Sequence, residues 1–120
     1  SGLTVHLRTG DLRTAAVPQA VQLTAYRILQ ESLTNAAKHA PGSVVRVTLT
    51  HHGGELRLGV VDDGAAVPPA DGPPTEAGYG ILGMGERARA VAGSCTAGRT
   101  EDGGFEVVAV LPTGRSDPTS

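Results

Sequence analysis

The chain has 120 residues, the usual size of one domain, and 39% of them are hydrophobic, which is enough for a single core. The formal net charge is −2, with one lysine among ten basic residues, so the surface is not built to neutralise a nucleic-acid backbone. No stretch approaches the roughly 20 apolar residues that cross a bilayer, and the first residues carry no signal pattern, so we expect no contact with a membrane.

The first third of the chain predicts a strand and then a long helix. Leu3, Val5 and Leu7 alternate with polar residues, which indicates a half-buried strand that ends near residues 9–11. Pro18 suits the first turn of a helix. Apolar residues then recur at three- and four-residue steps up to residue 40: Val21, Ala25, Ile28, Leu29, Leu33 and Ala36.

The middle of the chain predicts a hairpin followed by a long loop. Two alternating runs, residues 45–49 and 56–60, are separated by the turn residues 51–54. After Asp62-Asp63-Gly64, the stretch up to Gly78 is rich in Ala, Pro, Gly, Asp and Glu and has no periodicity. Long loops in compact domains commonly cover a site, so this segment is either a lid or a surface linker.

The last third predicts a short helix and two more strands. Ile81, Met84 and Ala88 have helical spacing, and strands follow near residues 94–98 and 105–111. The order strand, helix, two strands, helix, two strands predicts an α+β fold, a two-layer α/β sandwich whose helices cover one face of a mixed sheet. The single cysteine excludes an internal disulfide, which fits a reducing compartment.

The chain ends suggest one folded domain cut from a longer protein. The sequence starts inside the first strand-like run, and its end is rich in Gly, Ser and Pro. We expect a folded domain over residues 1–112 and a flexible tail over residues 113–120.

One helix face carries a set of polar residues with chemical potential. The polar residues of the long helix follow one another at steps of four, four, three and one: Arg27, Glu31, Asn35, Lys38 and His39. We interpret this spacing as one helix face, opposite the apolar stripe. Oxygen ligands of this kind suit a hydrated Mg²⁺, and the cations suit phosphate oxygens. A solvated face with Arg27–Glu31 pairing is the alternative.

Two loop segments carry further chemistry. Asp62 follows an apolar strand, where its carboxylate can accept a hydrogen bond from an exocyclic amine such as that of adenine, although Asp-Gly is also ordinary turn chemistry. Glycines over residues 78–85 lead into a helix, where bare backbone N–H groups attract phosphate. The Gly78-x-Gly80-x-x-Gly83 pattern does not follow a strand, which disfavours a dinucleotide-binding Rossmann domain, and no P-loop sequence occurs.

Taken together, residues 26–40, 62–64 and 78–87 resemble the N, G1 and G2 boxes of sensor histidine kinases, in family order and at family spacing. The resemblance covers roughly residues 3–112. The Gln-Glu-x-x-x-Asn-x-x-Lys-His and Gly-Met-x-Glu-Arg forms resemble the subfamily paired with response regulators that bear helix-turn-helix output domains. The family implies a Bergerat-type ATP-binding fold, shared more distantly with type II topoisomerases, Hsp90 and mismatch-repair ATPases.

The resemblance implies roles for the helix residues. Asn35 would ligate Mg²⁺, and Glu31 would be the acidic residue that orients or deprotonates the phosphoryl acceptor. Lys38 and His39 would approach the phosphates of ATP. Phosphoryl transfer depends mainly on positioning and charge stabilisation, so such a site needs metal, amides and cations but no protein nucleophile.

The resemblance also implies roles in the two loop segments. Asp62 would bind the adenine amine, and Gly64 would leave room for the base. The ATP-binding residues of the third box would be Gly78, Gly80, Ile81, Gly83 and Met84. The sequence departs from the family at Ala66, where the G1 box has a second glycine. A methyl group there narrows the pocket or stiffens the lid hinge, which favours weaker nucleotide binding.

The implied function is that of the catalytic domain of a two-component histidine kinase in the cytoplasm. The resemblance leaves open whether the full-length protein is anchored in a membrane. It would pass the γ-phosphoryl of Mg·ATP to a histidine on a separate dimerisation domain and so act on a response regulator indirectly. His6, His51 and His52 are expected to be surface residues rather than acceptors. A nucleotide-sensing module without transfer and a serine kinase of the anti-sigma-factor type are the alternatives.

Overall fold

The computed structural model describes residues 3–10, 17–64 and 80–113 of the chain. Its elements follow the predicted order of strand, helix, two strands, helix and two strands. They are β1 (Thr4–Thr9), α1 (Gln19–His39), β2 (Val44–His52), β3 (Glu55–Asp62), α3 (Ile81–Ala90), β4 (Ser94–Arg99) and β5 (Phe105–Pro112). Neither described helix is long and apolar enough to cross a membrane.

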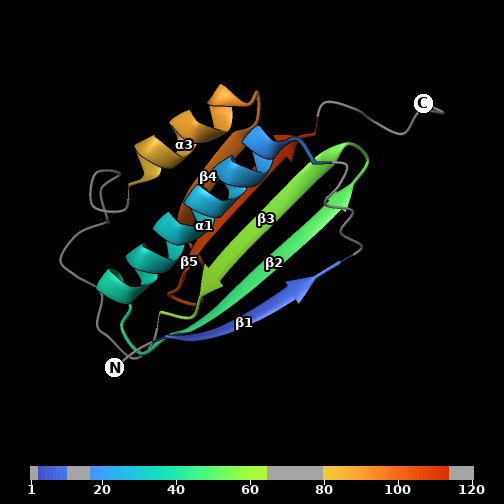
Figure 1. The fold of residues 1–120 in the computed structure, drawn as a ribbon. Helices are drawn as coiled ribbons and strands as arrows, with labels where there is room; N and C mark the ends of the chain where they lie inside the picture. Colours follow the sequence, from blue (N-terminus) through green and yellow to red (C-terminus); the bar gives the residue numbers. More distant parts are fainter. Residues whose placement is uncertain (1–2, 11–16, 65–79, 114–120) are drawn as a thin grey trace.

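The five strands form one mixed sheet in the order β1-β2-β3-β5-β4. β1 pairs with β2 in parallel, and the other three pairs are antiparallel. Both helices lie on the same face of the sheet, α1 over β3 and β5 and α3 over β4 and β5 (Figure 1). This arrangement confirms the predicted two-layer α+β sandwich, with helices covering one face of a mixed sheet.

The core lies between the helices and the covered face of the sheet. Because side chains alternate along a strand, every second residue of β3 and β5 points to the helices and is buried. The helix side is supplied mainly by Ile28 of α1 and by Met84 and Ala88 of α3, which are at most 1% exposed. Most of these core side chains are aliphatic, as the composition predicts.

The hairpin between β2 and β3 is tighter than the sequence suggested. Residues 51 and 52 were expected in the turn, but they extend β2, and His52 pairs with Glu55. Only Gly53 and Gly54 connect the strands, and both have positive φ angles, 61° and 78°. A two-residue turn of this kind needs φ > 0 at both positions, which glycine adopts without strain.

β1 is a strand, as predicted, but the expectation that it is half-buried is wrong. All of its residues are exposed, and Leu7 is 64% exposed. The reason is that β1 lies at the sheet edge beyond β2, and α1 and α3 cover β3, β4 and β5 (Figure 1).

Several expectations fall at the limits of the described residues. Thr113, placed in the tail by composition, is buried and its N–H donates to Gly54 O at 2.9 Å. The rest of the expected tail, residues 114–120, lies outside the described residues. So do the expected lid over residues 65–79 and, within it, Ala66 and Gly78.

Candidate functional site

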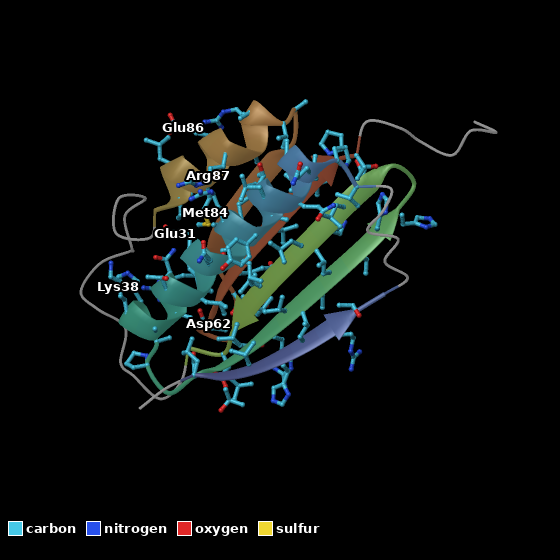
Figure 2. All side chains as sticks on the ribbon, viewed as in Figure 1. Glu31, Lys38, Asp62, Met84, Glu86 and Arg87 are labelled. Atoms are coloured by element: carbon cyan, nitrogen blue, oxygen red, sulfur yellow. The ribbon has the colours of Figure 1, made fainter. Side chains whose placement is uncertain are left out.

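Buried polar side chains gather where the C-terminal half of α1 lies over the end of β3. Among the described residues, five polar or charged side chains are buried: Ser32, Asn35, Ser43, Asp62 and Thr113. The first two are on α1, and Ser43 and Asp62 lie where β2 begins and β3 ends. Figure 2 shows Glu31, Lys38 and Asp62 around this half of α1, and Met84 on α3 beside it. Thr113 lies at the other end of the sheet, beside Gly54. Burial of polar groups is costly, so the concentration of the other four at one end marks a candidate site.

Asp62 is the last residue of β3 and points to the helix-covered face. It follows Leu58 and Val60 in the alternation of the strand, and it is 8% exposed. Its Oδ1 accepts a hydrogen bond from the Gly64 N–H at 2.8 Å. Burial raises the pKa of Asp62, and the hydrogen bond from Gly64 partly offsets that effect. The charge of Asp63 raises the pKa further, and a backbone hydrogen bond from Phe105 lowers it.

The neighbouring Asp63 is exposed and makes a structural contact. Its Oδ1 accepts the Val44 N–H at 3.0 Å, and its own N–H donates to Val44 O at 3.1 Å. These bonds fasten the start of β2 to the end of β3. Of the two aspartates in the sequence motif, only Asp62 therefore faces the candidate site.

Two glycines, Gly64 and Gly104, let the backbone pack closely around Asp62. Gly64 has a φ of 76°, and a β-carbon on it would collide with Gly103 O. A β-carbon on Gly104 would collide with Asp62 O. In the sequence, Gly103 and Gly104 simply lie between the last two predicted strands, and nothing local shows that this turn packs against the end of β3.

The polar residues of α1 do not share one exposed face, which corrects the sequence interpretation. Lys38 and His39 are exposed and Glu31 is partly exposed, but Asn35 is 4% exposed. The reason is helical geometry: Asn35 follows Ile28 by seven residues, almost two turns, so it points in nearly the same direction, toward the core. Asn35 is thus a buried amide on the core-facing side of α1.

The start of α3 lies against α1. Gly80 is its N-cap, with φ 63° and no side-chain hydrogen bond to the cap. A β-carbon on Gly80 would lie 2.8 Å from Glu31 Oε2, so the acidic residue of α1 reaches the N-terminal end of α3. Ile81 packs against the core. Gly83 is exposed, and a β-carbon there would meet nothing within 4 Å.

Met84 is placed in the core rather than on an open surface. It is 1% exposed, and its Sδ lies 3.7 Å from Ser32 Oγ. The Ser32 hydroxyl donates to Ile28 O at 2.8 Å. In this conformation, Met84 thus joins α3 to α1 and does not present its side chain to a ligand.

Two buried hydroxyl groups were missed from the sequence. The burial of Ser32 could not be predicted, because a single serine within a helical pattern does not indicate that its hydroxyl is buried. Ser43 is 1% exposed, and its Oγ is the one buried side-chain polar atom of the described residues that has no hydrogen-bond partner. It lies at the start of β2, two residues before Val45, which pairs with Asp62.

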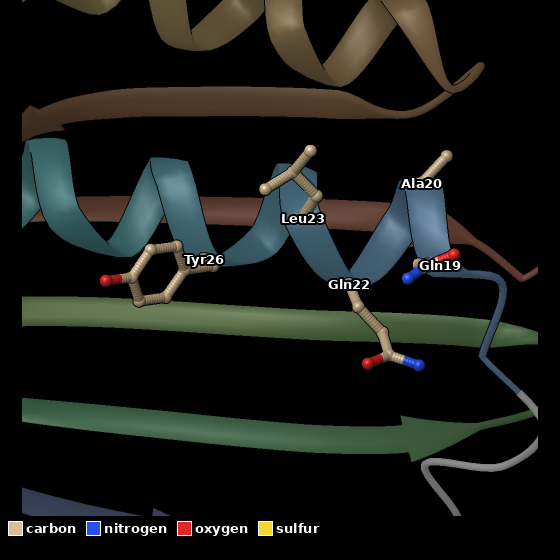
Figure 3. Close-up of a pocket in the computed structure, with 5 residues that line it drawn as sticks. All are labelled: Gln19, Ala20, Gln22, Leu23 and Tyr26. Carbon is tan, nitrogen blue, oxygen red and sulfur yellow. The ribbon is translucent and has the colours of Figure 1, made fainter.

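An apolar groove lies at the opposite end of α1. Its lining includes Ala25, Leu29 and, from the starting half of β3, Leu56 and Leu58. A shallow depression beside it is lined by Gln19, Ala20, Gln22, Leu23 and Tyr26 (Figure 3). None of the sequence-predicted site residues lines either of these two hollows.

Comparison with known proteins places the chain in a family. Residues 20–115 match the family described as Histidine kinase-, DNA gyrase B-, and HSP90-like ATPase. The chain is 37% identical over 112 residues to the Sensor histidine kinase YxjM of Bacillus subtilis, covering 93% of this chain and 26% of the relative. It is 36% identical over 92 residues to the Nitrate/nitrite sensor protein NarX of Escherichia coli, covering 77% and 15%. The chain thus spans about a quarter or less of these relatives.

Solved structures share its fold. The blue-light activated histidine kinase of Erythrobacter litoralis EL346 superposes with a TM-score of 0.67 at 24% identity, over 96% of this chain and 39% of that one. The catalytic domain of histidine kinase ThkA superposes with a TM-score of 0.69 at 17% identity, over 92% and 78%. These structural similarities confirm the predicted fold, and the family match and the relatives confirm the family resemblance. The chain belongs to the family of histidine kinase-, DNA gyrase B- and HSP90-like ATPases.

Proposed function

We propose that this chain is the catalytic domain of a sensor histidine kinase, which binds Mg·ATP and donates its γ-phosphoryl to a histidine on a separate dimerisation domain. The observation that carries the proposal is the meeting of three segments at one end of the sandwich. Asp62 is buried below α1, and Glu31 of α1 contacts Gly80 at the start of α3. Sensor histidine kinases among the relatives support the same activity.

Asp62 is the proposed contact for adenine. Its carboxylate accepts the Gly64 N–H and a backbone hydrogen bond from Phe105, which fix its orientation, and an ionised carboxylate has further lone pairs that can accept a hydrogen bond from the adenine amine. A buried carboxylate gains more from such a bond than an exposed one, because fewer water molecules compete. Burial disfavours the charged form of the Asp62 carboxylate and so raises its pKa. This loss of solvation is the energetic cost of placing the carboxylate where it can contact adenine.

The start of α3 is the proposed contact for the phosphates. The first N–H groups of a helix have no partners within the helix and attract anions. Gly83 is unfavourable inside a helix by about 1 kcal/mol relative to alanine, and no described neighbour needs its small size. A ligand that approaches the Gly83 backbone closely explains why this position has no side chain. Gly80 and Ile81 begin the same turn, and Lys38 and His39 add exposed groups at the end of α1.

The residues present fit a magnesium ion. Asn35 of α1 supplies an amide oxygen, and Mg²⁺ is commonly held by one or two side chains together with phosphates and water. When bound, the ion neutralises charge on the transferring phosphoryl group. Because Asn35 is buried, we propose that its role as a ligand requires its side chain to become accessible when nucleotide binds.

Glu31 is the proposed acidic residue of the reaction. It is partly exposed and lies at the junction of α1 and α3, beside the proposed phosphate site. From there its carboxylate can accept the proton of an incoming histidine or orient its ring. The proposed protein partners are therefore the histidine-bearing dimerisation domain and, through it, a response regulator with a helix-turn-helix output domain. A cytoplasmic location follows from these partners.

Transfer in trans tests the proposal. The chain is mixed with radiolabelled Mg·ATP and a dimerisation domain, for example that of the YxjM relative, and the chemical stability of the label is measured. We expect acid-labile phosphate on the dimerisation domain and none on the chain alone. Acid-labile label on the isolated chain would place the acceptor within these 120 residues.

The same assay separates the alternatives. ATP binding without transfer to any dimerisation domain would indicate a nucleotide-sensing module. Acid-stable phosphate on a protein partner would indicate a serine kinase of the anti-sigma-factor type.

A further inference from the structure

The contact between Glu31 and Gly80 joins two segments that are far apart in the sequence. A β-carbon on Gly80 would lie 2.8 Å from Glu31 Oε2, 3.0 Å from its Cδ and 3.3 Å from its Cγ. The end of the Glu31 side chain thus lies directly against the bare Cα of Gly80. Such close approach of a side chain to a backbone is possible only where a glycine stands.

Packing against Gly80 constrains the position of the Glu31 carboxylate. Among the described residues, no hydrogen bond or ion pair holds it. A long side chain without such a partner takes the rotamer that its neighbours allow. The space left by Gly80 is therefore the feature that directs the carboxylate to the junction of α1 and α3.

We propose that Gly80 is a positioning residue for Glu31, and that its missing side chain keeps the carboxylate at the start of α3, where the phosphoryl acceptor is activated. A side chain at position 80 displaces the carboxylate without breaking the fold, because the atoms it meets are the flexible end of Glu31. The effect on the reaction rests on the function proposed above, whereas the effect on the carboxylate does not.

The left-handed backbone of Gly80 requires a matched control. At φ 63°, alanine is strained whatever the space around it. Gly53, in the turn between β2 and β3, has a φ of 61° and nothing within 4 Å of its β-carbon position. Gly53→Ala therefore carries the same backbone strain without touching Glu31, and the two variants should lose similar free energy of unfolding.

The first measurement follows the carboxylate itself in the nucleotide-free chain. The side-chain carboxyl ¹³C resonance of Glu31 is identified by its absence in Glu31→Gln. We expect Gly80→Ala to shift this resonance and Gly53→Ala to leave it at the wild-type position. An unchanged resonance in Gly80→Ala would overturn the proposal, whatever the chain does with ATP.

The second measurement follows transfer to the dimerisation domain at saturating Mg·ATP. We expect Gly80→Ala to lower kcat by about tenfold, in the range of losses seen when acid–base groups are misplaced, and Gly53→Ala to retain it. In the Glu31→Gln background, Gly80→Ala should lower kcat by a clearly smaller factor than in the wild-type background, because the carboxylate that it displaces is gone. Equal losses in both backgrounds would contradict a positioning role. A wild-type chain that transfers no phosphoryl group would refute the proposed function instead. The Glu31 carboxyl resonance would still test whether Gly80 positions the Glu31 carboxylate.

Discussion

The two ends of α1 face the same sheet but differ in chemistry. At the N-terminal end, Ala25 and Leu29 line an apolar groove with side chains of β3, and Leu23 is 52% exposed beside it. At the C-terminal end, Asn35 and Asp62 are buried although both are polar. Stability alone favours apolar residues at both ends, so the buried polar groups mark the end selected for function. The apolar groove and the buried polar groups thus distinguish the two ends of α1.

Met84 should give the largest effect, on stability rather than binding. Because its side chain is fully buried at the polar end of α1, Met84→Ala should lower the free energy of unfolding by about 2–5 kcal/mol. Met84→Leu keeps the volume and should cost less than about 1.5 kcal/mol. Denaturant unfolding measures both. A Met84→Leu variant with normal stability but weakened ATP binding would show that the side chain contacts nucleotide after all.

The two aspartates give a matched pair for binding. Asp62→Asn should raise the Kd for ATP by about tenfold to a hundredfold, since it replaces an acceptor-only group with one that can present an NH₂ to the adenine amine. Asp63→Asn keeps an oxygen for the Val44 N–H and should bind ATP as the wild type does. Isothermal titration calorimetry compares them. Equal affinities in all three proteins would remove Asp62 from the adenine contact.

Acid should reveal the cost of burying Asp62. The pKa of Asp62 is raised in the folded protein, so its stabilising contribution is fully present below the unfolded pKa and is lost as pH rises through the folded pKa. Asp62→Asn should therefore be more stable than the wild type at pH 7, with a gain that shrinks as the pH falls toward about 3. Thermal unfolding across this range measures the difference. A gain that grows on acidification would mean that the pKa is lowered.

The apolar end should show the smallest effects. Leu23→Ala removes an exposed side chain and should change the free energy of unfolding by at most about 0.5 kcal/mol. Its affinity for ATP should equal that of the wild type, because the depression in Figure 3 lies away from Asp62. A clear loss of ATP affinity in this variant would place nucleotide at the wrong end for our account.

The fold was largely readable from sequence because its signals are local. The long helix has an apolar period of 3.6, and β3 and β5 alternate with a period of two. The exposure of β1 was not readable, since it depends on where the helices lie across the sheet. The tight turn at Gly53 was also missed, because two histidines that look like turn residues continue the strand.

The site was readable only in part. The strand-end position of Asp62 follows from the apolar run before it, and that prediction is confirmed. The burial of Asn35 follows from helical phase, which spacing alone misjudged. The contacts of Glu31 with Gly80 and of Ser32 with Met84 join residues about 50 positions apart, so they appear only once α1 and α3 are packed together.

The most direct test is to map where nucleotide binds. Backbone amide resonances of the ¹⁵N-labelled chain are followed while Mg·ATP is added. We predict the largest shifts at residues 31–39, at residues 62–64 and at Gly80, with residues 19–26 unaffected. Shifts confined to residues 19–26 and to Leu56 and Leu58, with the Asp62 and Gly64 resonances unmoved, would contradict the account.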